Sequence, residues 1–278
     1  MAQHVFQQVD VFTAVAFKGN PLAVVFAGDD LSDRQMAAIA NWTNLSETTF
    51  LLRPNDATAD YHVRIFTPTR ELPFAGHPTL GSCHAWLALG HQPKGETVIQ
   101  QCGAGLVRVK RDGARLAFAA PPLRRSGEVA PELRSRIAAS LGVGQPAIRA
   151  AQWIDNGPGW VAVMLGSRRE VLELKHDAGV LPDQSLGVVA PWDAARDGSE
   201  AQFEVRAFMS RGGEDPVTGS LNAGLAQWLI GAGLAKPRYV AAQGTALGRA
   251  GRVHVAQEGD TIWIGGDVAG CVAGTITL

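Results

Sequence analysis

The sequence predicts an α+β fold of two pseudo-symmetric, β-rich halves, each a barrel-like set of strands that encloses a central helix. The first observation is a repeat, because residues 61–66 (YHVRIF) are echoed by residues 203–208 (FEVRAF). The second is that residues 77–82 (HPTLGS) are echoed 138 positions later (215 − 77) by residues 215–220 (DPVTGS). The third is one long helix in each half that is apolar on most faces, which is typical of a helix inside a fold. Strands wrapped around such a helix also leave no open sheet edge.

Short apolar segments bounded by turn residues predict the strands of the first half. We place them at residues 9–12, 23–26, 48–52, 61–66, 97–101, 106–111 and 115–119. A helix is predicted over 33–41, because Ser32 and Gln35 form a capping box ahead of apolar residues at helical spacing. The central helix of this half is predicted over 78–89.

A linker is predicted over residues 120–127, which contain two prolines and no apolar period. We therefore expect two repeats, 1–119 and 129–278, with a strand exchange possible at the C-terminus. The second repeat should contain a helix over 131–141 and its own central helix over 216–230. Further echoes support the repeat: a second capping box at Ser167 and Glu170, and hairpin turns at residues 112–113 and 258–259.

Composition excludes several classes of protein. The chain has 278 residues, 46% hydrophobic and 18% charged, with a net charge of −1, which is typical of a soluble globular protein. No long basic run favours nucleic acid, and no segment predicts a membrane span or a signal peptide. Three cysteines without Cys-x-x-Cys spacing predict reduced thiols in a cytoplasmic protein. The histidines lack the spacing of metal ligands, and no dinucleotide-binding motif is present, so we expect neither a metal nor a dinucleotide.

Both central helices are predicted to begin at an X-Pro pair, His77-Pro78 and Asp215-Pro216. If the two halves face each other, both helix N-termini point into one cleft. Each N-terminus carries a partial positive charge and free N–H donors, so together they predict a site for a substrate carboxylate. The alternative is that His77 and Asp215 are simple helix caps.

Glu47 is the candidate acid/base, because it stands where a loop enters an apolar strand. Partial loss of solvent there would raise the carboxyl pKa toward the range useful for proton transfer. The alternative is an exposed glutamate with no catalytic role.

Four motifs carry a resemblance to a known family. They are residues 19–21 (GNP), 44–48 (NLSET), 74–81 (FAGHPTLG) and 213–220 (GEDPVTGS). In this order and spacing, over essentially the whole chain, they resemble the phenazine-biosynthesis PhzF-like family. The resemblance implies the diaminopimelate-epimerase fold and a cofactor-independent isomerase, usually a homodimer. In the phenazine enzyme the substrate is trans-2,3-dihydro-3-hydroxyanthranilate, a small carboxylic acid.

The resemblance also implies residue roles. Glu47 would move a proton between two carbons on one face of the substrate. His77, Asp215 and Ser220 would hold and polarise the substrate, and the backbone at Gly76 and Gly219 would help to hold its carboxylate. Related racemases carry a cysteine at each of the positions held here by His77 and Asp215. This chain lacks both, which favours proton migration on one face over racemisation.

Two other functions stay open at this point. A hydrolase could use Ser220, His77 and Asp215, although no Gly-x-Ser-x-Gly elbow is present. A non-catalytic protein could bind small acids in the same cleft without turnover. The sequence does not identify the physiological substrate.

Overall fold

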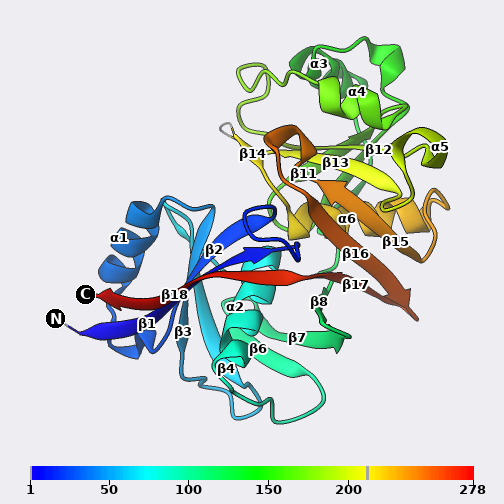
Figure 1. Ribbon diagram of the computed structural model, residues 1–278. Coiled ribbons are helices and arrows are strands. Elements are labelled where there is room, and N and C mark those ends of the chain that lie inside the picture. Colours follow the sequence, from blue (N-terminus) through cyan, green and yellow to red (C-terminus); the bar gives the residue numbers. More distant parts are fainter. Residues whose placement is uncertain (1, 211–212) are drawn as a thin grey trace. The chain divides into compact units, whose positions relative to one another are not determined.

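The structure is a computed structural model that describes residues 2–210 and 213–278. Position 1 of the first predicted repeat and positions 211–212 of the second therefore lie outside the described residues. The chain divides into two compact units, Met1–Ala119 with Gly265–Leu278, and Ala120–Ile264. Each unit combines β-strands with a few helices (Figure 1). The predicted α+β class is confirmed.

The first unit is a mixed sheet around one helix. Its strands are β1 (Gln3–Val11), β2 (Asn20–Val25), β3 (Glu47–Leu52), β4 (Tyr61–Phe66), β5 (Glu71–Leu72), β6 (Val98–Cys102), β7 (Gly105–Asp112), β8 (Arg115–Ala119) and β18 (Val268–Thr277). β1 pairs antiparallel with β18 and with β2, while β2 and β3 run parallel. Helix α2 (Gly76–Ala88) packs against β1, β2, β3 and β8, and ten of its residues are buried. Helix α1 (Asp33–Thr43) packs on β3.

The second unit repeats this plan. Its strands are β9 (Arg125–Glu128), β10 (Ala150–Asp155), β11 (Trp160–Met164), β12 (Ser185–Pro191), β13 (Phe203–Phe208), β14 (Glu214–Asp215), β15 (Arg238–Gln243) and β16 (Gly251–Glu258), and β17 (Thr261–Gly266) spans the boundary between the units. Its helices are α3 (Pro131–Leu141), α4 (Arg168–Glu173), α5 (Ala194–Asp197) and α6 (Gly219–Gly231), with short 3-10 turns elsewhere in the chain at Gly28–Asp30, Gln145–Ala147 and Thr245–Leu247. The apolar helix α6 packs on β10, β11 and β16. Each predicted central helix therefore lies among the strands of its own unit.

Two boundaries bear on the sequence prediction. The sequence predicts repeats over 1–119 and 129–278 with a possible strand exchange at the C-terminus, and residues 265–278 belong to the compact unit that starts the chain. The predicted linker 120–127 also contains the start of β9, which pairs antiparallel with β10. An edge strand needs only backbone pairing on one side, so it carries no apolar period to reveal it. Arg125 places its guanidinium over the ring of Trp153, 3.4 Å from the centroid.

The central helices correct the register of the repeat. α2 and α6 are each 13 residues long, and their first residues, Gly76 and Gly219, are 143 positions apart (219 − 76). The predicted offset of 138 and the predicted helix starts at Pro78 and Pro216 are therefore wrong. His77 lies in the first turn of α2, while Asp215 lies in strand β14, four residues before α6. The position equivalent to His77 is Ser220, so the contrast drawn between His77 and Asp215 as equivalent positions does not hold.

Local signals at the other elements are confirmed in most cases. Ser32 and Gln35 form both hydrogen bonds of the predicted capping box at α1. At α4 Ser167 accepts from the Glu170 N–H, but the Glu170 carboxylate accepts from Gly166 N instead of closing the box. The predicted turn at residues 112–113 joins β7 to β8.

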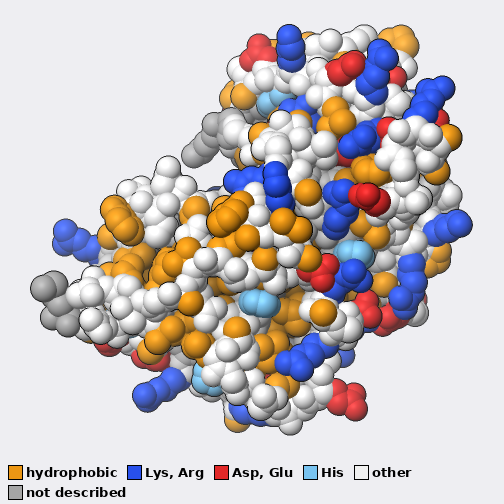
Figure 2. All heavy atoms as spheres, viewed as in Figure 1, with side chains coloured by type: hydrophobic (Ala, Val, Ile, Leu, Met, Phe, Trp, Pro, Cys, Tyr) orange, Lys and Arg blue, Asp and Glu red, His pale blue; other side chains and the backbone are white. Residues whose placement is uncertain are grey.

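Charged side chains of both signs are scattered over the face shown in Figure 2, as the net charge of −1 suggests. Among the described residues, no helix is long and apolar enough to cross a membrane.

Candidate functional site

Glu47 is the first residue of β3, at the end of a short connection from α1. Asn44 ends that helix in a left-handed conformation (φ 53°), which turns the chain toward the sheet within three residues. β3 runs parallel to β2, and Glu47 is in register with Leu22. Its side chain is 16% exposed. The carboxylate is therefore largely removed from water, as the sequence predicts.

His77 is a basic partner of Glu47. Its Nε2 lies 3.4 Å from Glu47 Oε2, and its side chain is only 5% exposed. Burial lowers the pKa of His77 to about 3, and a hydrogen bond to the Pro21 carbonyl opposes that shift only in part. The imidazole is therefore neutral near pH 7, and its contact with Glu47 is a polar contact of a neutral ring with a carboxyl group.

Asn20 lies on the other side of the imidazole. Its Nδ2 is 3.4 Å from His77 Nδ1, and the residue is fully buried in β2. His77 Nε2 and Glu47 Oε2 approach to 3.4 Å without the geometry of a hydrogen bond, so their contact is a polar contact only. In the sequence Asn20 stands out only as part of a family motif, and only the structure shows its contact with His77.

The first turn of α2 supplies backbone donors beside these side chains. Ala75 is the N-cap, and it makes no side-chain capping bond. Gly76 and His77 occupy the first two helical positions, where backbone N–H groups have no partner inside the helix. Neither His77 nor Asp215 is the helix cap that the sequence predicts, because the helices begin before His77 and well after Asp215.

Asp215 belongs to the second unit, where it is held by the turn that precedes α6. Its Oδ2 accepts a hydrogen bond of 2.5 Å from the hydroxyl of Thr218. Thr218 is the N-cap of α6. Asp215 is thus tied to the start of the helix through a threonine rather than directly.

A buried glutamine connects this turn to the sheet. Gln243, the last residue of β15, is fully buried and hydrogen-bonds to three residues of the turn and helix. Its Oε1 accepts from Thr218 N (3.1 Å) and Asn222 Nδ2 (2.8 Å). Its Nε2 donates to Asp215 O (3.1 Å) and Thr218 Oγ1 (3.0 Å). Gln243 is not among the site residues that the sequence predicts, although a glutamine at the end of an apolar strand is a signal for it.

Ser220 and Gly219 are the first two residues of α6. The Ser220 hydroxyl accepts from the indole N–H of Trp160 at 3.0 Å, and its carbonyl accepts from Asn156 Nδ2 at 2.8 Å. An indole N–H only donates, so Trp160 cannot act as the base that a serine nucleophile requires. Within the second unit these contacts favour a structural hydroxyl over a nucleophile.

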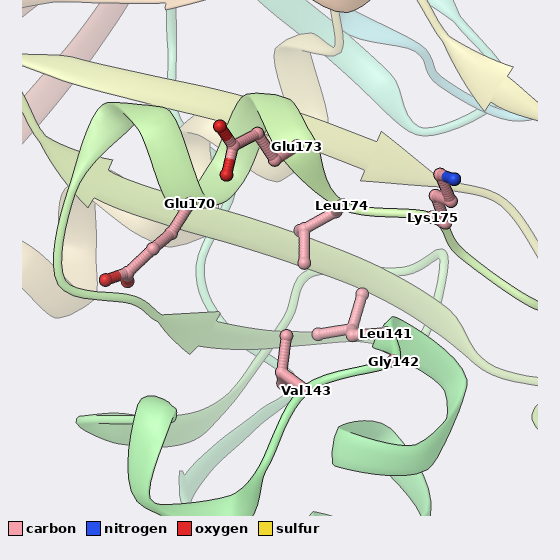
Figure 3. Close-up of a pocket in the computed structure, with 7 residues that line it drawn as sticks. All are labelled: Leu141, Gly142, Val143, Glu170, Glu173, Leu174 and Lys175. Atoms are coloured by element: carbon pink, nitrogen blue, oxygen red, sulfur yellow. The ribbon is translucent and has the colours of Figure 1, made fainter.

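The second unit also contains a cavity of about 360 Å³ between α3 and α4. Figure 3 shows the side chains of Leu141, Val143 and Leu174 pointing toward one another, with the carboxyl groups of Glu170 and Glu173 directed away from them. It is lined by Leu141, Gly142, Val143, Glu170, Glu173, Leu174 and Lys175. None of the predicted site residues lines it, and the Glu170 carboxylate is already bonded to Gly166 N.

Metal-ligand and thiol chemistry find little support in the part of the chain that the structure describes. No group of three His, Cys, Asp or Glu residues there is placed to hold a metal ion. The three cysteines are unpaired, and Cys83 and Cys102 are buried. Burial raises the pKa of Cys83 to about 12, so its thiol is a packed, unreactive group.

The fold and the motifs define a known family. A sequence model of the phenazine biosynthesis-like protein family (PhzC-PhzF) matches residues 9–271. The chain belongs to the phenazine biosynthesis-like protein family.

Related proteins carry different names. A Schizosaccharomyces pombe protein, antisense-enhancing sequence 1, is 35% identical, with 99% of each chain covered. An uncharacterized isomerase of Pasteurella multocida is 32% identical over 98% of this chain and 94% of its own. Trans-2,3-dihydro-3-hydroxyanthranilate isomerase of Pseudomonas chlororaphis is 51% identical, but only over 31% of this chain and 30% of its own.

Solved structures share the fold. A PhzF-family protein of Enterococcus faecalis matches with a TM-score of 0.83 at 26% identity, and the match covers 100% of both chains. A hydroxyproline epimerase of Agrobacterium vitis matches with a TM-score of 0.60 at 16% identity, covering 99% of this chain and 92% of its own. The second likeness shows the fold alone, and it confirms the predicted epimerase-like architecture.

Proposed function

We propose that this protein is an isomerase that moves a proton between two carbons of a small carboxylic acid, with Glu47 as the proton carrier and no cofactor. The observation that carries the proposal is the pair of Glu47 and His77, two largely buried side chains 3.4 Å apart at the first turn of α2.

This pair has the properties that proton transfer at carbon requires. A carboxyl group that is mostly removed from water exchanges a proton more readily near neutral pH than an exposed one. Its neighbour His77 is kept neutral by burial, so it adds no positive charge that would hold Glu47 permanently ionised. A neutral imidazole can donate to the carboxylate or accept from the carboxylic acid, depending on its tautomer.

The remaining predicted residues would bind the substrate. Backbone N–H groups at Gly76 and Gly219 stand at helix N-termini, which favour a carboxylate. His77, Asp215 and Ser220 would contact the polar groups of the same substrate. The contacts of Asp215 with Thr218 support this role, since they fix an acceptor beside the start of α6.

The substrate class follows from the relatives and is part of the proposal. Isomerases of trans-2,3-dihydro-3-hydroxyanthranilate match about a third of this chain. A full-length relative at 35% identity has a name that states no such reaction. We therefore propose a dihydro-hydroxyanthranilate-like acid, and not that compound in particular.

The test is hydrogen exchange at substrate carbon in heavy water with trans-2,3-dihydro-3-hydroxyanthranilate, followed by mass spectrometry. Glu47→Gln keeps the shape and removes the ionisable group, so exchange should fall at least about 100-fold. Glu96→Gln, an exposed glutamate of the same unit, should leave exchange unchanged. Undiminished exchange in Glu47→Gln would remove Glu47 from the mechanism.

Two further measurements, calorimetry of acid binding and fluorophosphonate labelling, separate the other functions. Tight binding of the acid without any exchange would favour the non-catalytic binding protein. Labelling of Ser220 by a fluorophosphonate probe would favour the hydrolase. The homodimer and the cytoplasmic location stay predictions, and light scattering would test the first of them.

A further inference from the structure

In each unit a buried glutamine of the sheet bonds to the central helix, Gln100 in β6 and Gln243 in β15. The two glutamines stand at different places in their strands, because Gln100 is in register with Tyr61 at the start of β4, whereas Ala241 is in register with Phe203 at the start of β13. Gln100 Nε2 donates to Thr79 Oγ1 at 3.0 Å, and Gln243 Oε1 accepts from Asn222 Nδ2 at 2.8 Å. Both contacts tie the sheet to the fourth residue of the central helix. They belong to the scaffold that the two units share.

Gln243 makes further bonds that Gln100 does not mirror. Gln243 also accepts from the backbone N–H of Thr218 and donates to the Thr218 hydroxyl. That hydroxyl donates in turn to Asp215 Oδ2 at 2.5 Å. Gln100 instead accepts from the hydroxyl of Tyr61 at 3.1 Å. When the starts of α2 and α6 are aligned, Ala75 is the counterpart of Thr218, and Leu72 is the counterpart of Asp215. The first unit therefore forms the equivalent turn without this hydroxyl and without this carboxylate, so neither group is needed to build the turn.

We propose that Thr218 and Gln243 are positioning residues, which form a hydrogen-bond relay that orients the Asp215 carboxylate toward a donor group of the bound acid. The inference rests on the proposed substrate-binding role of Asp215 and names the residues that make it effective.

The hydrogen-bond directions of the relay are fixed. Gln243 Nε2 can only donate, so Thr218 Oγ1 accepts from it and must turn its own hydrogen toward Asp215. Gln243 cannot rotate freely, because its carbonyl oxygen is held by two donors. A short bond from a hydroxyl to a carboxylate is among the stronger hydrogen bonds in proteins. One carboxylate oxygen is thus fixed, and the plane and lone pairs of Asp215 are set before a ligand arrives.

The first test measures binding of 3-hydroxyanthranilate by calorimetry. Thr218→Val keeps the side-chain shape and loses the hydroxyl, and it should weaken binding about tenfold or more. Thr218→Ser restores the donor and should bind within about twofold of the wild type. Ser140→Ala is the matched control, because it removes another buried hydroxyl of the same unit, one that donates to Ile137 O. It should leave binding unchanged.

A double-mutant cycle with Asp215→Asn distinguishes a relay from general loosening. If Thr218 acts through Asp215, adding Thr218→Val to Asp215→Asn should weaken binding no further. Equal losses in the two backgrounds, or wild-type binding by Thr218→Val, would overturn the proposal.

A second measurement does not depend on a ligand or on turnover. In crystals the Asp215 carboxylate should keep its orientation in Thr218→Ser and change it in Thr218→Val. An unchanged orientation in Thr218→Val would overturn the relay, even if 3-hydroxyanthranilate does not bind. If the relay variants behave as expected while Glu47→Gln retains exchange, the relay stands and the proposed proton carrier fails.

Discussion

The first turns of α2 and α6 are the same backbone with different chemistry. Both follow a two-residue strand, both start with glycine, and both helices are tied to the sheet by a buried glutamine. At the second helical position one has His77, which contacts Glu47, and the other has Ser220, which contacts Trp160. The candidate site carboxylate of the second unit is Asp215, which lies in the preceding strand β14 and not in the helix.

The comparison teaches which parts of the repeat carry the fold and which carry the chemistry. Shared features are packing and buried hydrogen bonds. They are a glutamine bonded to the fourth residue of each helix, an Arg–Glu pair next to each two-residue strand, and a glycine at the sixth helical position. The features that differ are titratable or hydroxyl groups near the helix starts. Since the shared features are structural, breaking them should change stability, and the two units should respond unequally.

The largest difference is expected at the Arg–Glu pairs. Arg206 and Glu214 are 9% and 11% exposed, while Arg64 and Glu71 are 21% and 43% exposed. Removing one partner of a buried pair leaves an uncompensated charge, so Glu214→Gln should cost about 3 kcal/mol in unfolding free energy. Glu71→Gln should cost about 1 kcal/mol or less. Urea denaturation measures both.

Salt sharpens this comparison. The loss in Glu71→Gln should shrink in 1 M salt, because exposed charges are screened, whereas the loss in Glu214→Gln should persist. Equal losses of unfolding free energy in the two variants, or a larger loss in Glu71→Gln, would contradict the view that the Arg206–Glu214 pair is the more buried one.

The second difference concerns Gly81 and Gly224, which are again 143 positions apart (224 − 81). A Cβ at Gly224 would lie 2.4 Å from the backbone oxygen of Ile154, and one at Gly81 would lie 2.5 Å from a terminal methyl of Leu22. A side-chain methyl can move, but a backbone carbonyl in a strand cannot. Gly224→Ala should therefore cost about 2 kcal/mol or more, and Gly81→Ala distinctly less. Thermal unfolding would show the order, and the reverse order would show that α2 is the more tightly packed helix.

The third difference is the pH dependence of stability that His77 contributes and that Ser220, at the equivalent position, cannot contribute. The pKa of His77 is about 3 in the folded protein, below its ordinary value of 6.5. Between these values the unfolded chain binds the extra proton, so His77 makes stability fall as the pH drops from 6.5 toward 3. The slope is at most about 1.4 kcal/mol per pH unit. His77→Gln should flatten the profile, whereas Ser220→Ala, at the equivalent position, should leave it unchanged. An identical slope in His77→Gln would mean that the imidazole is not buried in the neutral form.

Local signals in the sequence were sufficient for much of the fold. Ser32 and Gln35 fixed the start of α1, and apolar helices with small residues predicted α2 and α6 within two or three residues. The X-Pro pairs misled the register, because proline is tolerated both inside a first turn, as Pro78 is, and in the turn before a helix, as Pro216 is. The pairing of β9 was missed because an exposed edge strand has no apolar pattern.

By itself, the sequence determined the repeat, the fold class, the family and the prominence of Glu47, because these depend on residue type and on order along the chain. Only the tertiary structure decided that His77 contacts Glu47, that Ser220 is its counterpart in the second unit, and that Gln243 reaches Asp215 through Thr218. These contacts join residues 25 or 30 positions apart across different elements (243 − 218, 77 − 47). No local pattern encodes them, since they arise from the parallel pairing of strands and from the burial of polar groups that must then find one another.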